Sequence, residues 1–229
     1  MKIPVKFYIS YSLLKFLALF FMTYDHVFRF IFKINDTDLI LLPGRFAFPI
    51  FTFLIAYNLA KKENFLKYIK RLSLFALITV PIDLYFFPKP YLNILFTFML
   101  AIALIWCLKK AVTVKNKPAR GIIFAYIILL GICLGFFVEY AIEGIILFAA
   151  LYYFFKSRKV VFFLLALCML AVMMPSLLYA CLIIPFGILL LLVEPVPSPN
   201  PSSFSKTGWM FYAYYPFHKL IIGLIAKMM

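Results

Sequence analysis

The chain is dominated by apolar segments about as long as a bilayer is thick, and they leave little sequence for anything else. Clusters of charge or proline bound nine such segments, at residues 12–32, 39–60, 72–87, 91–108, 121–138, 141–155, 160–174, 177–193 and 209–226. A helix needs about 20 residues to cross a bilayer. The sequence therefore predicts an all-α, polytopic membrane helix bundle of about nine transmembrane helices, forming one integral-membrane domain over residues 1–229.

Composition agrees with this prediction and excludes several classes of protein. Apolar residues make up 66% of the chain and charged residues 14%, whereas about a quarter of a soluble domain is charged. No room remains for a soluble ATPase module, an ectodomain or a DNA-binding domain, and no nucleic acid partner is expected. The four cysteines lie in apolar runs without metal-ligand spacing, so we expect them to pack and expect no metal site. Residues 194–206 are rich in Pro and Ser and predict a loop before the last helix.

The positions of the basic residues predict the orientation of the chain. If the N-terminus is cytoplasmic, 17 of the 23 Lys and Arg residues fall in cytoplasmic segments. The other six are Arg29, Lys33, Arg45, Lys89, Lys219 and Lys227. This bias follows the positive-inside rule and accounts for the net charge of +15. We therefore predict a cytoplasmic N-terminus and an outside C-terminus.

Several ionisable residues lie inside the predicted spans, where charge is costly and usually faces a bundle interior or a wet cavity. Asp25, His26 and Arg29 come late in the first span, and His218 follows Pro216 in the last. Asp25 and Arg29 are four residues apart and can pair on one helix face. A neutralising ion pair beside a packing histidine would explain these residues without chemistry. However, the chain has only two histidines and both fall within spans, which favours a functional role.

Further polar residues fall at similar depths on other spans. Arg45 lies in LLPGRFAFPIF (41–51), where prolines disturb the helix. Broken helices are tolerated where they line a cavity, so Arg45 is either an anion ligand or a snorkelling side chain. Asn93 opens the fourth span, and Glu139 and Glu143 flank an outer turn. These two carboxylates are either an acid and base pair or a solvated loop edge. The convergence of such residues with the histidines favours a buried chemical site.

Six motifs resemble the TraX family, integral-membrane proteins linked to N-terminal acetylation of conjugative pilin. The matching stretches are LKFLALFFMTYDH (14–26), GRFAFPIFTFLIAYNL (44–59), KYIKRL (67–72), LNILFTF (92–98), VEYAIEGI (138–145) and YAYYPFH (212–218). They occur in the family's order over almost the whole chain. The family is distantly similar to the type-three integral-membrane acyltransferases, which place a histidine late in their first helix and use acyl-CoA.

The resemblance implies an acetyl-CoA-dependent acyltransferase in the bacterial cytoplasmic (inner or plasma) membrane. It implies His26 as the general base, with Asp25 as its neighbour and His218 as a second site residue. Arg45 would bind an anionic part of the donor or acceptor. The family typically has an aspartate where this chain has Glu139, which keeps a carboxylate but changes its reach. The acceptor would be an amine or hydroxyl at the outer side, on a pilin-like N-terminus, another peptide or an envelope glycan.

The residue types agree with acyl transfer from a thioester. Such a reaction needs a base for the attacking group and donors for the oxyanion, and histidine suits the first task. The expected binding residues are Arg45, Arg29, Asn93, Glu139 and Glu143. The basic segments 61–71 and 109–120 are candidates for contact with CoA phosphates, although the positive-inside rule already explains them.

Two other classes of function fit the same residues. The first is a small transporter or a proton or ion relay built on Asp25, His26, Arg29 and His218. Inverted-repeat transporters have matching broken helices in two halves, and the sequence has no such pair. The second is a pilus-assembly scaffold without catalysis, against which the cost of intramembrane charge argues. Thermal stabilisation by CoA separates the enzyme from both.

Overall fold

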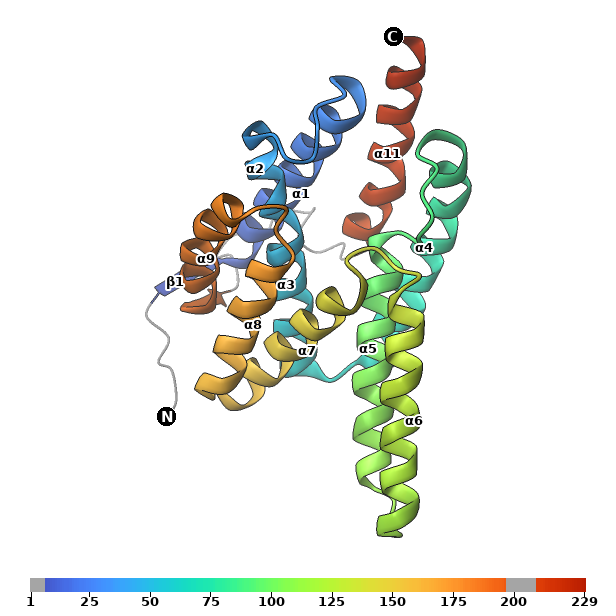
Figure 1. Ribbon diagram of the computed structural model, residues 1–229, viewed down its shortest axis with the longest axis vertical. Coiled ribbons are helices and arrows are strands. Elements are labelled where there is room, and N and C mark those ends of the chain that lie inside the picture. The colour runs from blue at the N-terminus through green and yellow to red at the C-terminus, as the bar shows by residue number, and fades with distance from the viewer. Residues whose placement is uncertain (1–6, 197–208) are drawn as a thin grey trace.

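A computed structural model describes residues 7–196 and 209–229, and that part of the chain forms nine long helices (Figure 1). They are α1 (Tyr11–His26), α3 (Ala47–Lys62), α4 (Phe65–Phe86), α5 (Ile94–Val112), α6 (Lys117–Gly135), α7 (Ala141–Ser157), α8 (Val160–Val172), α9 (Leu177–Leu191) and α11 (Met210–Met228). Each predicted segment overlaps one of these helices, which confirms the all-α helix bundle.

Length and composition single out three stretches that can cross a membrane: Leu39–Lys62, Ile94–Val112 and Lys117–Gly135. Helices α8 and α9 are apolar but shorter, with 13 and 15 residues. These three stretches indicate that the chain is a membrane protein. The count of about nine spans and the orientation of the chain remain predictions.

Short elements near the helix ends were not expected from the sequence. A π-helix, η1 (Val27–Ile31), continues α1, and a 3-10 helix η2 (Leu39–Leu41) and a short α2 (Leu42–Arg45) lead into α3. Two short strands, β1 (Phe7–Ser10) and β2 (Val193–Val196), pair in parallel. Four-residue strands lie at the lower limit of length at which period-two patterning is readable, and this pair forms where the start of α1 meets the end of α9.

Strand β2 corrects the start of the predicted Pro- and Ser-rich loop at 194–206. Glu194, Pro195 and Val196 belong to β2 and pair with β1. The rest of that loop, 197–206, lies outside the described residues.

The helices pack so that the last one returns to the first half of the chain. Helix α11 packs against α4 and reaches η1, while α3 packs against α1 and α7. Helix α6 packs on α5 and projects with it beyond the rest of the bundle (Figure 1). Only 11% of the apolar window of α6 is buried, so most of its apolar side chains face away from the rest of the bundle.

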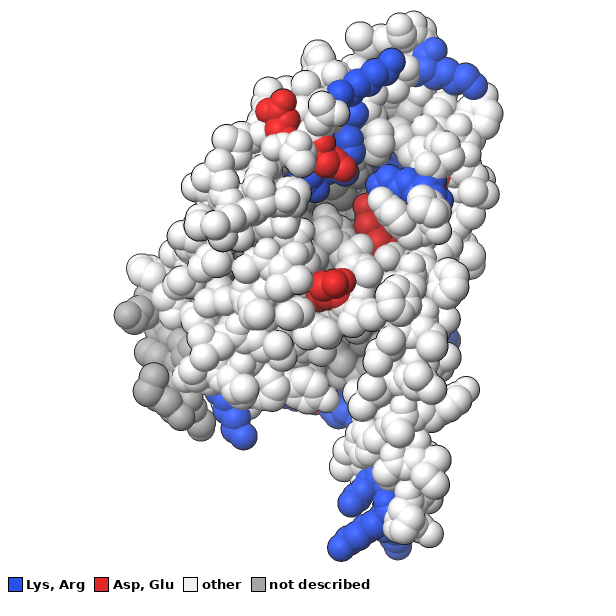
Figure 2. Space-filling view, in the orientation of Figure 1, with Lys and Arg blue, Asp and Glu red and all other residues white. Residues whose placement is uncertain are grey.

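Charge separates the bundle into two ends. On the face drawn in Figure 2, the lower end shows Lys and Arg alone, and the upper end shows charges of both signs. A largely uncharged belt lies between them. We call the end where α3 passes into α4, at Lys62–Phe65, the basic end, and the end where α1 passes into η1, at His26, the histidine end.

Candidate active site

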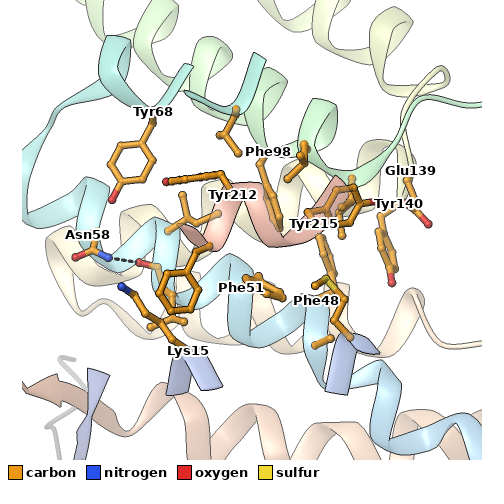
Figure 3. A pocket seen from close by; sticks show the side chains of 18 of the residues that line it. Lys15, Phe48, Phe51, Asn58, Tyr68, Phe98, Glu139, Tyr140, Tyr212 and Tyr215 are labelled. Atoms are coloured by element: carbon orange, nitrogen blue, oxygen red, sulfur yellow. Dashed lines mark hydrogen bonds between the residues drawn. The ribbon is translucent and has the colours of Figure 1, made fainter. Parts of the chain in front are cut away.

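An elongated cavity of about 650 Å³ connects the two ends of the bundle. Its lining includes both Ala47 and Lys62, the first and last residues of α3, so it follows that helix for about 22 Å at 1.5 Å per residue. Figure 3 shows Lys15 and Asn58 at one side of this cavity and Glu139 and Tyr140 at the other. Aromatic side chains line the length between them. The shape suits a long ligand with a polar head and a less polar tail.

At the histidine end, the two histidines of the chain form a hydrogen-bonded pair. Nδ1 of His26 lies 2.6 Å from Nε2 of His218, and the two rings are almost parallel, with an angle of 5° between their planes. Nδ1 of His218 lies 2.9 Å from the carbonyl oxygen of Tyr214. The structure thus brings together residues from α1 and α11 that the sequence separates widely.

When both rings are neutral, the contact with the Tyr214 carbonyl determines which nitrogen of each histidine carries the hydrogen. A carbonyl oxygen only accepts, so Nδ1 of His218 carries the hydrogen and Nε2 of His218 is an acceptor. His26 must then donate from Nδ1, and its Nε2 keeps a free lone pair. His26 lines the cavity, whereas His218 is 4% exposed and is absent from the lining. In this arrangement the unpaired ring nitrogen of the pair belongs to His26, the histidine that lines the cavity.

The local sequence explains how each histidine reaches this place. His26 ends α1, and the chain then widens into the π-helix η1, a distortion that is frequent at functional sites. Pro216 lies inside α11, two residues before His218. Because proline lacks an N–H, it frees a carbonyl and bends the helix there.

Asp25 and Arg29 also line the cavity, but they pair with each other rather than with the histidines. Nη2 of Arg29 donates to Oδ1 of Asp25 at 3.1 Å, and its Nη1 lies 3.0 Å from Oδ1 of Asp36. Among the described residues, the buried Nε of Arg29 has no hydrogen-bond partner. One N–H of this guanidinium is therefore buried without a hydrogen bond, which costs free energy.

Arg45 lies behind this network rather than in the cavity lining. Its Nη2 donates to the backbone carbonyl of Asp36 at 2.9 Å and lies 3.5 Å from the Asp36 carboxylate. The same acidic residue is thus shared by Arg29 and Arg45. In this arrangement Arg45 holds the loop after η1 over the histidine end.

Gly44 allows α2 to lie directly against Asp25. A Cβ atom added at Gly44 would stand 2.5 Å from Cβ and 2.6 Å from Oδ1 of Asp25. Real Cβ atoms do not approach other atoms so closely. The glycine of the GRFAFP block is therefore needed for the close packing of α2 on α1.

The other expected binding residues fall in different places. Glu139 lines the cavity and pairs with Lys89 at 3.3 Å. Asn93 is buried, caps α5 by accepting from the Leu95 amide, and donates to the Asp83 carboxylate at 3.1 Å. Glu143 is half-buried in the first turn of α7 and is absent from the cavity lining.

The basic end of the cavity is lined by residues of segment 61–71, a candidate for contact with CoA phosphates, and by Lys15, which the sequence assigned only to orientation. Lys15, Lys61, Lys62 and Arg71 all line it, from three different helices. Lys15 also stacks over the rings of Tyr11 and Phe211. The positive-inside rule already accounts for basic residues there, so the sequence alone did not separate a binding cluster from the orientation signal. Among the described residues, no group of His, Cys, Asp and Glu side chains could hold a metal ion.

Comparison with known proteins identifies a family to which the chain is similar. The model of the TraX protein family matches residues 10–226, nearly the full length of the chain. The chain belongs to the TraX family. The resemblance drawn from the six motifs is thereby confirmed, and the TraX family is associated with F-pilin acetylation. No curated protein and no solved structure matches the chain.

Proposed function

We propose that this TraX-family protein is an integral-membrane acyltransferase that transfers an acetyl group from cytoplasmic acetyl-CoA to an amine or hydroxyl at the outer side. One observation supports this most strongly. A single cavity joins four basic side chains at one end to an oriented histidine at the other. The predicted orientation places the basic end in the cytoplasm, where acetyl-CoA is found.

The cavity suits CoA in both its charge and its walls. Phosphates are recognised by Lys and Arg side chains, and Lys15, Lys61, Lys62 and Arg71 supply these at the basic end. Tyr68 and Tyr212 lie at the same side of the cavity (Figure 3), where aromatic rings can stack on a base. A donor bound this way extends its thioester along the aromatic stretch towards His26.

The residues at the histidine end suit the reaction itself. Nε2 of His26 removes the proton from the acceptor nitrogen or oxygen while that atom attacks the thioester carbon. A C–N or C–O bond forms, the C–S bond breaks, and CoA leaves as a thiolate that regains the proton from the imidazolium. The Arg29 guanidinium lines the cavity and is suited to the oxyanion. The acceptor is a peptide, a pilin-like N-terminus or a glycan.

His218 acts through His26 rather than on substrate. Its acceptor nitrogen fixes the tautomer and ring orientation of His26, as orienting groups do in other histidine-based sites. Asp25 acts similarly on Arg29, because its carboxylate is bound to that guanidinium. The chemistry therefore centres on His26 and Arg29, with His218 and Asp25 as positioning residues.

The test is transfer of radiolabelled acetyl from acetyl-CoA by the protein in lipid nanodiscs. Trialanine and glucose serve as amine and hydroxyl probes, and free CoA is measured in the same samples. The His26→Ala variant is expected to lose transfer while keeping CoA-dependent thermal stabilisation. Phe20→Ala is the matched control, because Phe20 lies on the same helix, is exposed and lines no described cavity.

Transfer that persists in His26→Ala would contradict the role of His26. Failure of CoA to stabilise the wild type, together with proton flux across the membrane of sealed vesicles that contain the protein, would instead favour the relay. In a relay, the hydrogen-bonded His26 and His218 would pass protons.

A further inference from the structure

A second cavity, of about 460 Å³, lies at the histidine end next to the first. It lies between the end of α4, the loop that follows α4, the end of α6 and one side chain of α11. Its lining includes Leu84, Phe87, Tyr91, Phe137 and Lys219. Leu84 and Phe137 are 69% and 61% exposed. The second cavity therefore borders the protein surface.

The two cavities share two residues, Lys89 and Glu139, which form an ion pair. The Lys89 ammonium lies 3.3 Å from Oε1 of Glu139. The ring of Phe30 connects this pair to the base: its centroid lies 5.6 Å from the His26 ring and 6.0 Å from the Lys89 ammonium. The ion pair is thus the boundary between the second cavity and the histidine end of the first.

The backbone of Glu139 is held firmly, while its side chain is not. Its N–H donates to the Leu92 carbonyl at 2.8 Å, and its carbonyl accepts from the Thr97 hydroxyl. The next two residues, Tyr140 and Ala141, have φ of 62° and 41°, a conformation that costs energy in residues other than glycine. Among the described contacts, the Glu139 carboxylate is bound by Lys89 alone. The ion pair can therefore open by side-chain rotation without moving the backbone.

A separate route to His26 is required if the first cavity holds the donor. CoA bound from the basic end would fill the cavity along its length, so an acceptor must approach His26 from elsewhere. Helix α4 begins at the basic end and ends beside the second cavity. Its 22 residues span about 33 Å, close to the thickness of a bilayer core. The second cavity therefore opens at the membrane face opposite the basic end.

We propose that the second cavity is the acceptor site and that the Lys89–Glu139 pair is the gate between acceptor and base. This proposal rests on the proposed acyltransferase function. The ligand is a primary amine or hydroxyl on a slender chain, whose N–H or O–H donates to the Glu139 carboxylate when Lys89 moves away. The reacting atom then reaches Nε2 of His26 past Phe30.

Two adjacent phenylalanines offer a matched test. Phe137 lines the second cavity, whereas Phe136 lines neither cavity, and they are 61% and 69% exposed. Each is changed to Cys in a background where the native cysteines Cys107, Cys133, Cys168 and Cys181 are replaced by Ala. The Phe137→Cys and Phe136→Cys proteins are then labelled with a bulky maleimide. Acetyl transfer to trialanine and stabilisation by CoA are measured for each protein with and without label.

The label at position 137 is expected to lower transfer at least 10-fold relative to the unlabelled Phe137→Cys protein, with CoA stabilisation retained. The label at position 136 is expected to leave transfer within 2-fold. Equal transfer with and without label at position 137 would overturn the acceptor site, and so would joint loss of transfer and CoA binding. If the unlabelled proteins transfer nothing, the failure belongs to the proposed function instead.

Discussion

Nδ1 of His26 and Nε2 of His218 lie 2.6 Å apart, and this contact joins the first helix of the bundle to the last. Nδ1 of His218 also faces the Tyr214 carbonyl at 2.9 Å, so this nitrogen carries the hydrogen of the His218 ring. Nε2 of His218 therefore accepts a hydrogen bond from Nδ1 of His26. The free nitrogen of the pair belongs to His26, the member that lines the cavity. This relationship explains why both histidines of the chain lie within helices that pack in the bundle.

Replacement of His218 tests its role as a positioning residue. His218→Ala should lower kcat about 100-fold, because a misoriented base loses much of the 10²–10⁴-fold that general bases supply. His218→Gln should recover part of the loss, since its amide oxygen can accept from His26. The pH profile of kcat should shift in His218→Ala, while KM for acetyl-CoA stays within 2-fold. An unchanged profile with normal kcat would show that His218 only packs.

Arg71 should bind the donor, whereas its neighbour Lys70 should not. Arg71 lines the basic end of the cavity, while Lys70 is exposed and outside the lining. Arg71→Gln should raise KM for acetyl-CoA about 10-fold, the loss of one charge-assisted hydrogen bond, and make it less sensitive to salt. Lys70→Gln is the control. Equal effects of the two substitutions would indicate only general attraction to the basic surface.

Gly44→Ala should destabilise the protein by about 1–3 kcal/mol, the usual cost of overpacking. The new methyl group would stand 2.5 Å from Cβ of Asp25, so α1 and α2 must separate. Gly121→Ala is the control, because no atom beyond its chain neighbours and its own helix backbone lies within 4 Å of a Cβ added there. Thermal unfolding in detergent measures both variants. A Gly44→Ala protein as stable as Gly121→Ala would contradict the close packing described at Asp25.

Glu63 should contribute stability that depends on pH. This exposed residue joins α3 to α4, and hydrogen bonds from Lys109, at 2.8 Å, and from Lys156 lower the pKa of its carboxyl. A lowered pKa gives stabilisation above the unfolded pKa of about 4.3 that is lost as the pH falls through the folded pKa. The Tm difference between wild type and Glu63→Gln should be constant from pH 6 to 8 and should disappear below about pH 4. The difference should be small, since solvent screens an exposed pair; one that grows in acid would contradict this assignment.

The helices of the bundle were predictable because a bilayer imposes a length on each span. The segment predicted at 177–193 corresponds to α9 (Leu177–Leu191), and the segment at 141–155 to α7 (Ala141–Ser157). Strands β1 and β2 were missed because their pairing depends on how distant helix ends meet. Such contacts are set by packing rather than by local pattern.

The site was only partly predictable, because the sequence gives depth along a helix but not rotation about it. His26 and His218 were identified from their depth, yet their direct contact depends on the facing of α1 and α11. Asp25 sits next to His26 in sequence, but adjacent helix residues point about 100° apart, and its carboxylate binds Arg29 instead. Asn93 caps a helix and bonds to Asp83, a role that its position before α5 indicates.

Mapping the bound donor shows whether acetyl-CoA occupies the first cavity. A radiolabelled CoA thioester with a photoreactive benzophenone acyl group is bound to the protein in nanodiscs, irradiated and mapped by mass spectrometry. We expect cross-links to the aromatic stretch near His26, at Phe48, Phe51 or Tyr215, and their loss when excess acetyl-CoA competes. Cross-links confined to the exposed face of α6, or insensitive to acetyl-CoA, would contradict a donor site in this cavity.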